Sequence, residues 1–188
     1  METMQPTLKR GRDVWDQVNM PRAEFLERVE KIKLQMQQRG IDVFLAYSNS
    51  ANEYGNVCYL SNYIMKMLQG AVVAITQTGE ATLICEGFAR DLPGVKSITW
   101  MDIRSCDNAS KETVAFLKEK KLIPSTLGMA GIESSMPYEQ FQFFTKSTEG
   151  CKFVHADDLI GEMRLIKSQK EVDQIRRASR VVGRIFDR

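Results

Sequence analysis

The feature that most constrains this 188-residue chain lies near its C-terminal end, where an amphipathic helix has a well-marked start. Ser168 is followed three residues later by Glu171, the spacing of a capping box, in which each side chain binds the backbone N–H of the other residue. A helix with one apolar face has to bury that face against a partner. We expect that partner to lie beyond Arg188. The apolar positions are Val172, Ile175, Ala178, Val182 and Ile185.

The same segment is rich in positive charge. Between residues 164 and 188 there are eight basic and three acidic residues, whereas the whole chain has 26 basic and 24 acidic residues. A near-balanced chain gives no electrostatic argument for nucleic acid or an anionic membrane as a partner. No aromatic side chains alternate with these arginines, as they do on nucleic-acid platforms. We therefore predict a solvated helix face, partly paired through Asp173 and Arg177.

Upstream, hydrophobic periodicity predicts helices that alternate with short strands. Such alternation, with one hairpin around Gly79, predicts an α/β fold. The predicted helices are 22–39, 52–60, 110–121 and one that begins at Pro137, and the predicted strands are 41–47, 71–76, 81–85, 97–102, 126–130 and 151–155.

The sequence offers little for catalysis or metal binding. His155 is the single histidine, and a metal centre needs several convergent donors. Asp157 and Asp158 are adjacent, so they are better explained by the N-terminal end of a helix. The four cysteines stand singly, which favours free thiols. Together these features predict that the chain itself carries no catalytic residues and no metal site.

The length of the apolar runs and the composition of the N-terminus bear on where the protein is located and whether it contacts a membrane. No apolar run approaches the roughly 20 residues that a membrane-spanning helix needs. The N-terminus lacks the basic and apolar segments of a secretory signal. These observations predict a cytoplasmic protein without a membrane partner.

Two motifs resemble those of a known protein family. Arg164-Leu-Ile-Lys-Ser168, followed by Glu171-Val-Asp-Gln-Ile-Arg-Arg-Ala178, resembles the joint between the two domains of creatinase, prolidase and aminopeptidase P. Asn56-Val-Cys-Tyr-Leu-Ser-Asn-Tyr63 is similar to that family's Asn-x-x-Tyr-Leu-Thr-Gly-Phe motif, with Asn62 in place of the glycine. The chain therefore resembles the N-terminal domain of these pita-bread metallohydrolases from Pro21 onward.

The resemblance implies a fold and a domain division. The fold would be a three-layer α/β/α unit, similar to ribonuclease H, with a mixed, mainly parallel sheet that includes one hairpin. Residues 1–20 would form an N-terminal arm, 21–163 the α/β domain, and 164–188 a linker and the first helix of a catalytic domain. The expected joint residues are Arg164, Lys167, Ser168 and Glu171.

The resemblance also implies a function for a longer parent protein. That protein would hydrolyse Xaa-Pro peptides with two divalent ions (Mn²⁺, Co²⁺ or Zn²⁺) in a C-terminal catalytic domain, and would form homodimers. This chain would supply dimer contacts and control access to the active site, with Tyr63 and Lys66 as candidates for a substrate mouth. Two alternatives stay open: a protein-binding module of a pseudoenzyme relative, and the N-terminal domain of a creatine-type amidinohydrolase.

Overall fold

The centre of the fold is β1 (Val43–Asn49), a strand whose two faces are both buried. A computed structural model describes residues 14–65 and 69–186. Alternate side chains of β1 enter two different hydrophobic cores: Phe44 and Ala46 lie in one, and Val43 and Leu45 in the other. A strand buried on both sides reads as a continuous apolar run, which is why this segment shows no alternation of polar and apolar residues.

Six strands form the sheet, in the order β4-β3-β2-β1-β5-β6. In the described part of the chain, β1 pairs with β5, β3 with β4 and β5 with β6 in parallel, whereas β2 is antiparallel to both β1 and β3. The predicted hairpin is thus confirmed, with Gly79 at φ 89° in its turn. The remaining strands are β2 (Gly70–Thr76), β3 (Ala81–Glu86), β4 (Asp102–Cys106), β5 (Thr126–Ala130) and β6 (Lys152–His155).

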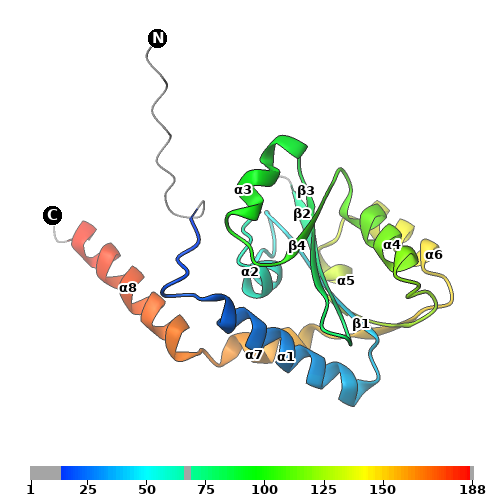
Figure 1. Cartoon of the computed structure of the whole chain (residues 1–188), viewed down its shortest axis with the longest axis horizontal. Coiled ribbons are helices and arrows are strands. Elements are labelled where there is room, and N and C mark those ends of the chain that lie inside the picture. The colour runs from blue at the N-terminus through cyan, green and yellow to red at the C-terminus, as the bar shows by residue number, and fades with distance from the viewer. Residues whose placement is uncertain (1–13, 66–68, 187–188) are drawn as a thin grey trace, which may run out of the picture.

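Helices cover both faces of this sheet, so the molecule has three layers (Figure 1). One face carries α1 (Arg22–Arg39), α2 (Gly55–Ser61) and α7 (Asp157–Leu165). The other carries α4 (Ala109–Glu119), α5 (Ile132–Ser135) and α6 (Tyr138–Ser147). This arrangement confirms the predicted α/β class with a mixed, mostly parallel sheet.

The first helix follows its sequence pattern closely. Its buried side chains include Phe25, Val29, Ile32 and Met36, at the predicted helical spacing. Gly40 ends α1 in the left-handed conformation, with φ 64°, and its N–H group bonds the carbonyls of the last turn, as glycine does at many helix ends.

The predicted strand at 97–102 is wrong. This region is a loop that follows α3 (Leu92–Lys96), and β4 begins only at Asp102. The loop side chains that suggested a strand instead fasten the loop to the end of α2. Thr99 Oγ1 donates to the carbonyl of Ser61 at 2.6 Å, and Trp100 Nε1 donates to the carbonyl of Leu60 at 2.9 Å.

The last helix leaves the body of the molecule. α8 (Gln169–Phe186) extends away from the three layers, and α1 and α7 lie beside its first turn (Figure 1). None of its side chains is buried. No helix in the described ranges is both long enough and apolar enough to cross a membrane.

Candidate functional site

Ser168 and Glu171 form the predicted capping box at the start of α8. The backbone N–H of Ser168 donates to Glu171 Oε2 at 2.8 Å, and the N–H of Glu171 donates to Ser168 Oγ at 3.2 Å. Only residues 166–168 separate α7 from α8. The joint between these helices is therefore short and begins the second helix with a defined geometry.

Arg28 of α1 reaches into this joint from the domain side, although it was not among the predicted site residues. Its residue exposure is 5%. The guanidinium donates to the backbone carbonyl of Tyr59 at 2.5 Å, and it lies 3.5 Å from both Glu24 Oε1 and Glu171 Oε1. It also stands over the Tyr59 ring, 4.0 Å from the ring centroid, where the face of an aromatic ring attracts a cation. Arg28 thus connects α1, α2 and α8.

Tyr59 adds the fourth helix to this cluster. Its hydroxyl donates to the carbonyl of Met163 in α7 at 3.1 Å. Burial is the main reason that the pKa of the Tyr59 phenol lies above its ordinary value, so the hydroxyl remains a hydrogen-bond donor at neutral pH.

Arg164, a predicted joint residue, ties the end of α7 to the start of α2. Its Nη1 donates to Asn56 Oδ1 at 2.8 Å and lies 3.3 Å from Glu53 Oε1. The guanidinium packs so closely over Gly55 that a Cβ atom there would collide with it. Lys167 makes no comparable contact with the domain: its ammonium donates to the carbonyls of Arg164 and Leu165.

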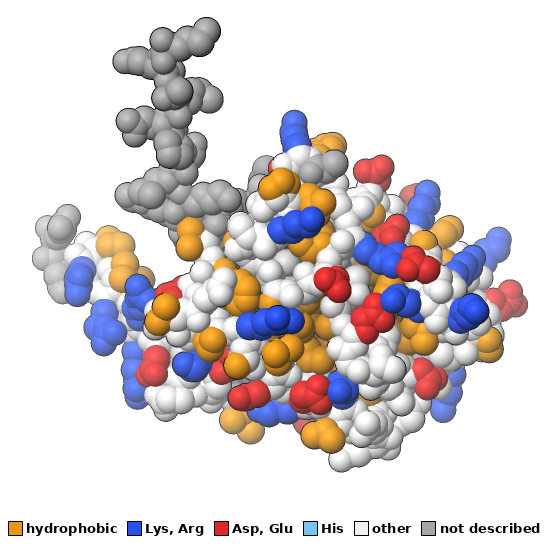
Figure 2. All heavy atoms as spheres, in the orientation of Figure 1, with side chains coloured by type: hydrophobic (Ala, Val, Ile, Leu, Met, Phe, Trp, Pro, Cys, Tyr) orange, Lys and Arg blue, Asp and Glu red, His pale blue; other side chains and the backbone are white. Residues whose placement is uncertain are grey.

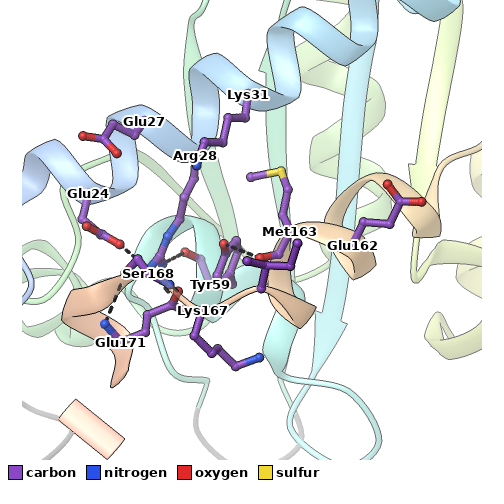
Figure 3. Close-up of a pocket in the computed structure, with 11 residues that line it drawn as sticks. Glu24, Glu27, Arg28, Lys31, Tyr59, Glu162, Met163, Lys167, Ser168 and Glu171 are labelled. Carbon is purple, nitrogen blue, oxygen red and sulfur yellow. Dashed lines mark hydrogen bonds and ion pairs between the residues drawn. The ribbon is translucent and has the colours of Figure 1, made fainter. Parts of the chain in front are cut away.

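A cavity of about 370 Å³ lies among these groups, and we call it the joint pocket (Figure 3). Its charged side chains are mixed in sign, and three of them, Glu24, Arg28 and Glu171, form ion pairs with one another. It contains no pair that resembles a nucleophile and its base. The joint pocket is lined by Glu24, Glu27, Arg28, Lys31, Tyr59, Glu162, Met163, Ile166, Lys167, Ser168 and Glu171.

A second cleft, of about 480 Å³, lies at the carboxyl ends of β1 and β3, two inner strands of the sheet. Several of its polar groups are engaged within the protein, whereas Gln140 Oε1 is buried without a hydrogen-bond partner among the described residues. Asn49 accepts from the N–H groups of Ala51 and Asn52 and donates to the carbonyl of Ser135. Glu86 accepts from the backbone of Gly70 and Ala109. These contacts tie the ends of β1 and β3 to the loops and helices beside them.

The two substrate-mouth candidates have different outcomes. Tyr63 is 3% exposed and belongs to the hydrophobic core beneath α1, with its hydroxyl 3.5 Å from Gln69 Oε1. Burial raises the pKa of this phenol. Lys66 lies outside the described residues. Their role at a substrate mouth stays a prediction.

Asp157 and Asp158 lie in the first turn of α7, at the N-terminal end of a helix as predicted, but neither caps it. Ala156 occupies the N-cap position, and no side chain caps the helix. Asp157 Oδ1 instead accepts from the N–H of Gly131 at 2.8 Å, and Asp158 pairs with Arg39 at 2.7 Å. His155 is exposed beside Asp157, with 3.2 Å between Nε2 and Oδ2. Within residues 14–65 and 69–186, no group of three His, Cys, Asp or Glu side chains could hold a metal ion.

Beyond its first turn, α8 exposes both its apolar face and its basic face to solvent. Hydrophobic and basic side chains are both visible along this helix (Figure 2). Ile175 is 53% exposed, and Ile185 is 67% exposed. The predicted pair between Asp173 and Arg177 is replaced by two others: Asp173 lies 3.6 Å from Arg176, and Arg177 lies 3.1 Å from Asp16.

Comparison with known proteins identifies the family. The model of the Creatinase/Prolidase N-terminal domain matches residues 28–166. An Xaa-Pro dipeptidase of Pyrococcus horikoshii is 28% identical over 158 residues, which is 84% of this chain and 40% of that protein. The chain thus spans about two fifths of the length of this curated relative.

Solved structures of this family have a similar fold. The prolidase from Pyrococcus horikoshii OT3 superimposes with a TM-score of 0.64 at 28% identity, over 84% of this chain and 40% of that one. The X-Pro aminopeptidase from Thermotoga maritima MSB8 has a TM-score of 0.62 at 19% identity, over 77% and 38% of the two chains. The latter likeness shows the fold alone. The family model covers most of the sequence, and the fold agrees with it, so this chain belongs to the creatinase/prolidase N-terminal domain family.

Proposed function

We propose that this chain is the non-catalytic N-terminal domain of a metal-dependent Xaa-Pro peptidase. The observation that carries the proposal is α8: it begins with a complete capping box and then exposes its apolar face. An amphipathic helix of this kind gains its stability from packing against a partner. The relative, an Xaa-Pro dipeptidase, is about two and a half times as long as the region it shares with this chain. A C-terminal catalytic domain would supply that partner.

In this proposal the catalytic ions belong to the C-terminal domain. Among the described residues no group of three His, Cys, Asp or Glu side chains could hold a metal ion, and the proposal assigns both ions to the C-terminal domain. Its contribution would be dimer contacts and control of access to the active site. Residues 14–20 would accompany the domain, since Trp15 packs edge-on against Phe25 of α1.

The reading frame beyond residue 188 gives the first test. The proposal expects roughly 200 further residues, the size of a domain, that include two Asp, one His and two Glu in order. The longer protein should hydrolyse Xaa-Pro dipeptides in the presence of Mn²⁺, whereas the 188-residue chain should not. A frame without those ligands would favour the protein-binding alternative, and hydrolysis of creatine but not of proline peptides would favour the amidinohydrolase.

Control of access has its own test at Tyr63 and Lys66. We expect Tyr63→Phe and Lys66→Ala to lower kcat/KM of the longer protein for Xaa-Pro dipeptides. The Phe variant is better suited than Tyr63→Ala, because the ring of Tyr63 is part of the core and its loss would cost about 3–5 kcal/mol of stability. Unchanged kcat/KM in both variants would contradict a role at the substrate mouth.

A further inference from the structure

The joint pocket contains a buried cation whose two carboxylate partners lie on different helices (Figure 3). Arg28 Nη2 is 3.5 Å from Glu24 on its own helix and 3.5 Å from Glu171 on α8. The two carboxylate side chains are only 11% and 17% exposed. Ion pairs shielded from water interact more strongly than exposed ones, and loss of one partner leaves an uncompensated charge.

The position of the Arg28 guanidinium is set by the α/β domain and not by α8. The backbone carbonyl of Tyr59 accepts one of its N–H groups at 2.5 Å, and the Tyr59 ring lies under its plane. Because a guanidinium presents its donors in a rigid fork, fixing it against α2 also fixes the direction from which Glu171 can approach.

Glu171 links this fixed cation to the start of α8. One carboxylate oxygen, Oε2, accepts from the Ser168 N–H in the capping box, and the other, Oε1, faces Arg28. The same side chain therefore starts the helix and attaches it to the domain. Two lysines, Lys31 and Lys167, also line the joint pocket, but among the described residues neither forms an ion pair with Glu24 or Glu171.

We infer that Arg28 is a positioning residue that sets the direction in which α8 leaves the α/β domain. Without Arg28, Glu24 and Glu171 would face each other with no cation between them, and their repulsion would move α8 away from α1. The consequence for catalysis rests on the proposed function, because α8 would carry this direction into the catalytic domain. The geometric claim stands on the contacts of this chain alone.

Residual dipolar couplings of backbone amides, measured on the weakly aligned ¹⁵N-labelled 188-residue chain, report the orientation of α8 relative to the sheet. In the unmodified chain we expect one alignment tensor to fit both β1 and α8. Arg28→Met keeps an apolar side chain over Tyr59 but removes the charge, and we expect the α8 couplings to depart from that tensor while the β1 couplings still fit it.

Two Glu→Gln variants distinguish the ion pair that attaches α8 to Arg28 from the capping box that starts α8. Glu171→Gln loses the ion pair but can still accept from the Ser168 N–H, since glutamine also serves in capping boxes. We expect α8 to remain helical and its couplings to change. Glu24→Gln is the matched control: its carboxylate is equally far from Arg28 but does not reach α8, so the α8 couplings should stay the same.

Couplings of α8 that still fit the original tensor in Glu171→Gln would overturn the inference. The same variant decides the question if Arg28→Met does not fold. The measurement involves no substrate, so its failure would leave the peptidase proposal intact. Conversely, absence of hydrolysis by the longer protein would leave the orientation result intact.

Discussion

At the scale of single residues, Gly131 shows how closely the chain is packed where β5 turns into α5. Its φ is 70°, and a Cβ atom there would lie 2.5 Å from the backbone oxygen of Tyr47 and 3.1 Å from Asn56 Nδ2. Glycine alone combines this conformation with so little space. The N–H of Gly131 also donates to Asp157, so the turn joins the central strand to the start of α7.

Gly131→Ala is therefore expected to lower the free energy of unfolding by about 2 kcal/mol or more, because strain and a backbone clash act together. Urea unfolding of the 188-residue chain measures this as a lower midpoint at an unchanged m-value. Gly161→Ala is the matched control: it lies within helix α7 with no atom near its Cβ position. It should stabilise the chain by about 0.5–1 kcal/mol. Equal effects of the two substitutions would contradict this explanation.

Among the helices, α8 has a first turn that packs against the α/β domain and a remainder that is exposed to solvent. Glu171 and Val172 are partly buried, whereas the helix is exposed from Ile175 onward. Amide hydrogens of residues 175–186 should therefore exchange much faster than those of β1, since helices without tertiary packing open easily. In the longer protein the same amides should be protected. Equal exchange in the two proteins would contradict the proposal that a second domain covers α8.

Ser168→Ala tests the anchored start. Loss of an N-cap hydroxyl costs about 1 kcal/mol, so the amides of the first turn should exchange faster, and helical circular dichroism should fall slightly. Ser179→Ala is the control, because Ser179 bonds only a carbonyl within the same helix. If both variants behaved alike, the hydroxyl of Ser168 would have no special role in starting the helix.

Elements with a strong local signal could be predicted from the sequence, and elements held by distant contacts could not. The helix at 22–39 and the strand at 126–130 have the predicted bounds, because periodicity and end signals such as Gly40 are local. The error at 97–102 arose because Thr99 and Trp100 bond carbonyls of α2, a partner that local pattern does not reveal.

The joint was predictable only in part for the same reason. The capping box of Ser168 and Glu171 follows from their spacing, whereas the partner of Glu171 lies 143 positions earlier in the chain. One signal could have found Arg28: it stands three residues after Phe25 and four before Ile32, on the buried face of α1. A charged residue within an apolar stripe usually has a partner.

At the scale of the whole molecule, buried acidic groups make the fold sensitive to alkaline conditions. Burial raises the pKa of the Cys85 thiol to about 11 and that of Cys106 to about 12. Burial likewise raises the pKa of Tyr47 to about 12, with a contribution from Glu86. In an unfolded chain, thiols titrate near pH 8.5 and phenols near pH 10 (rough reference values). Between these limits the unfolded state binds fewer protons than the folded state.

Stability should therefore fall as pH rises above about 8.5, first through the thiols and above about pH 10 also through Tyr47. Urea unfolding midpoints between pH 7 and pH 11 would measure this (about the range set by those titrations). Cys85→Ala combined with Cys106→Ala should lower stability at neutral pH but flatten the decline between roughly pH 8.5 and 10. An unchanged decline in that double variant would show that other groups cause it.

The short joint also has a mechanical consequence. α8 has 18 residues, so it is about 27 Å long at roughly 1.5 Å per residue. A tilt of about 10° at its first turn would displace its far end by about 5 Å, given that length. α8 thus acts as a lever that pivots about its first turn. A small change in the orientation of the first turn, beside Tyr59, would therefore become a larger displacement of any structure attached to the far end of α8.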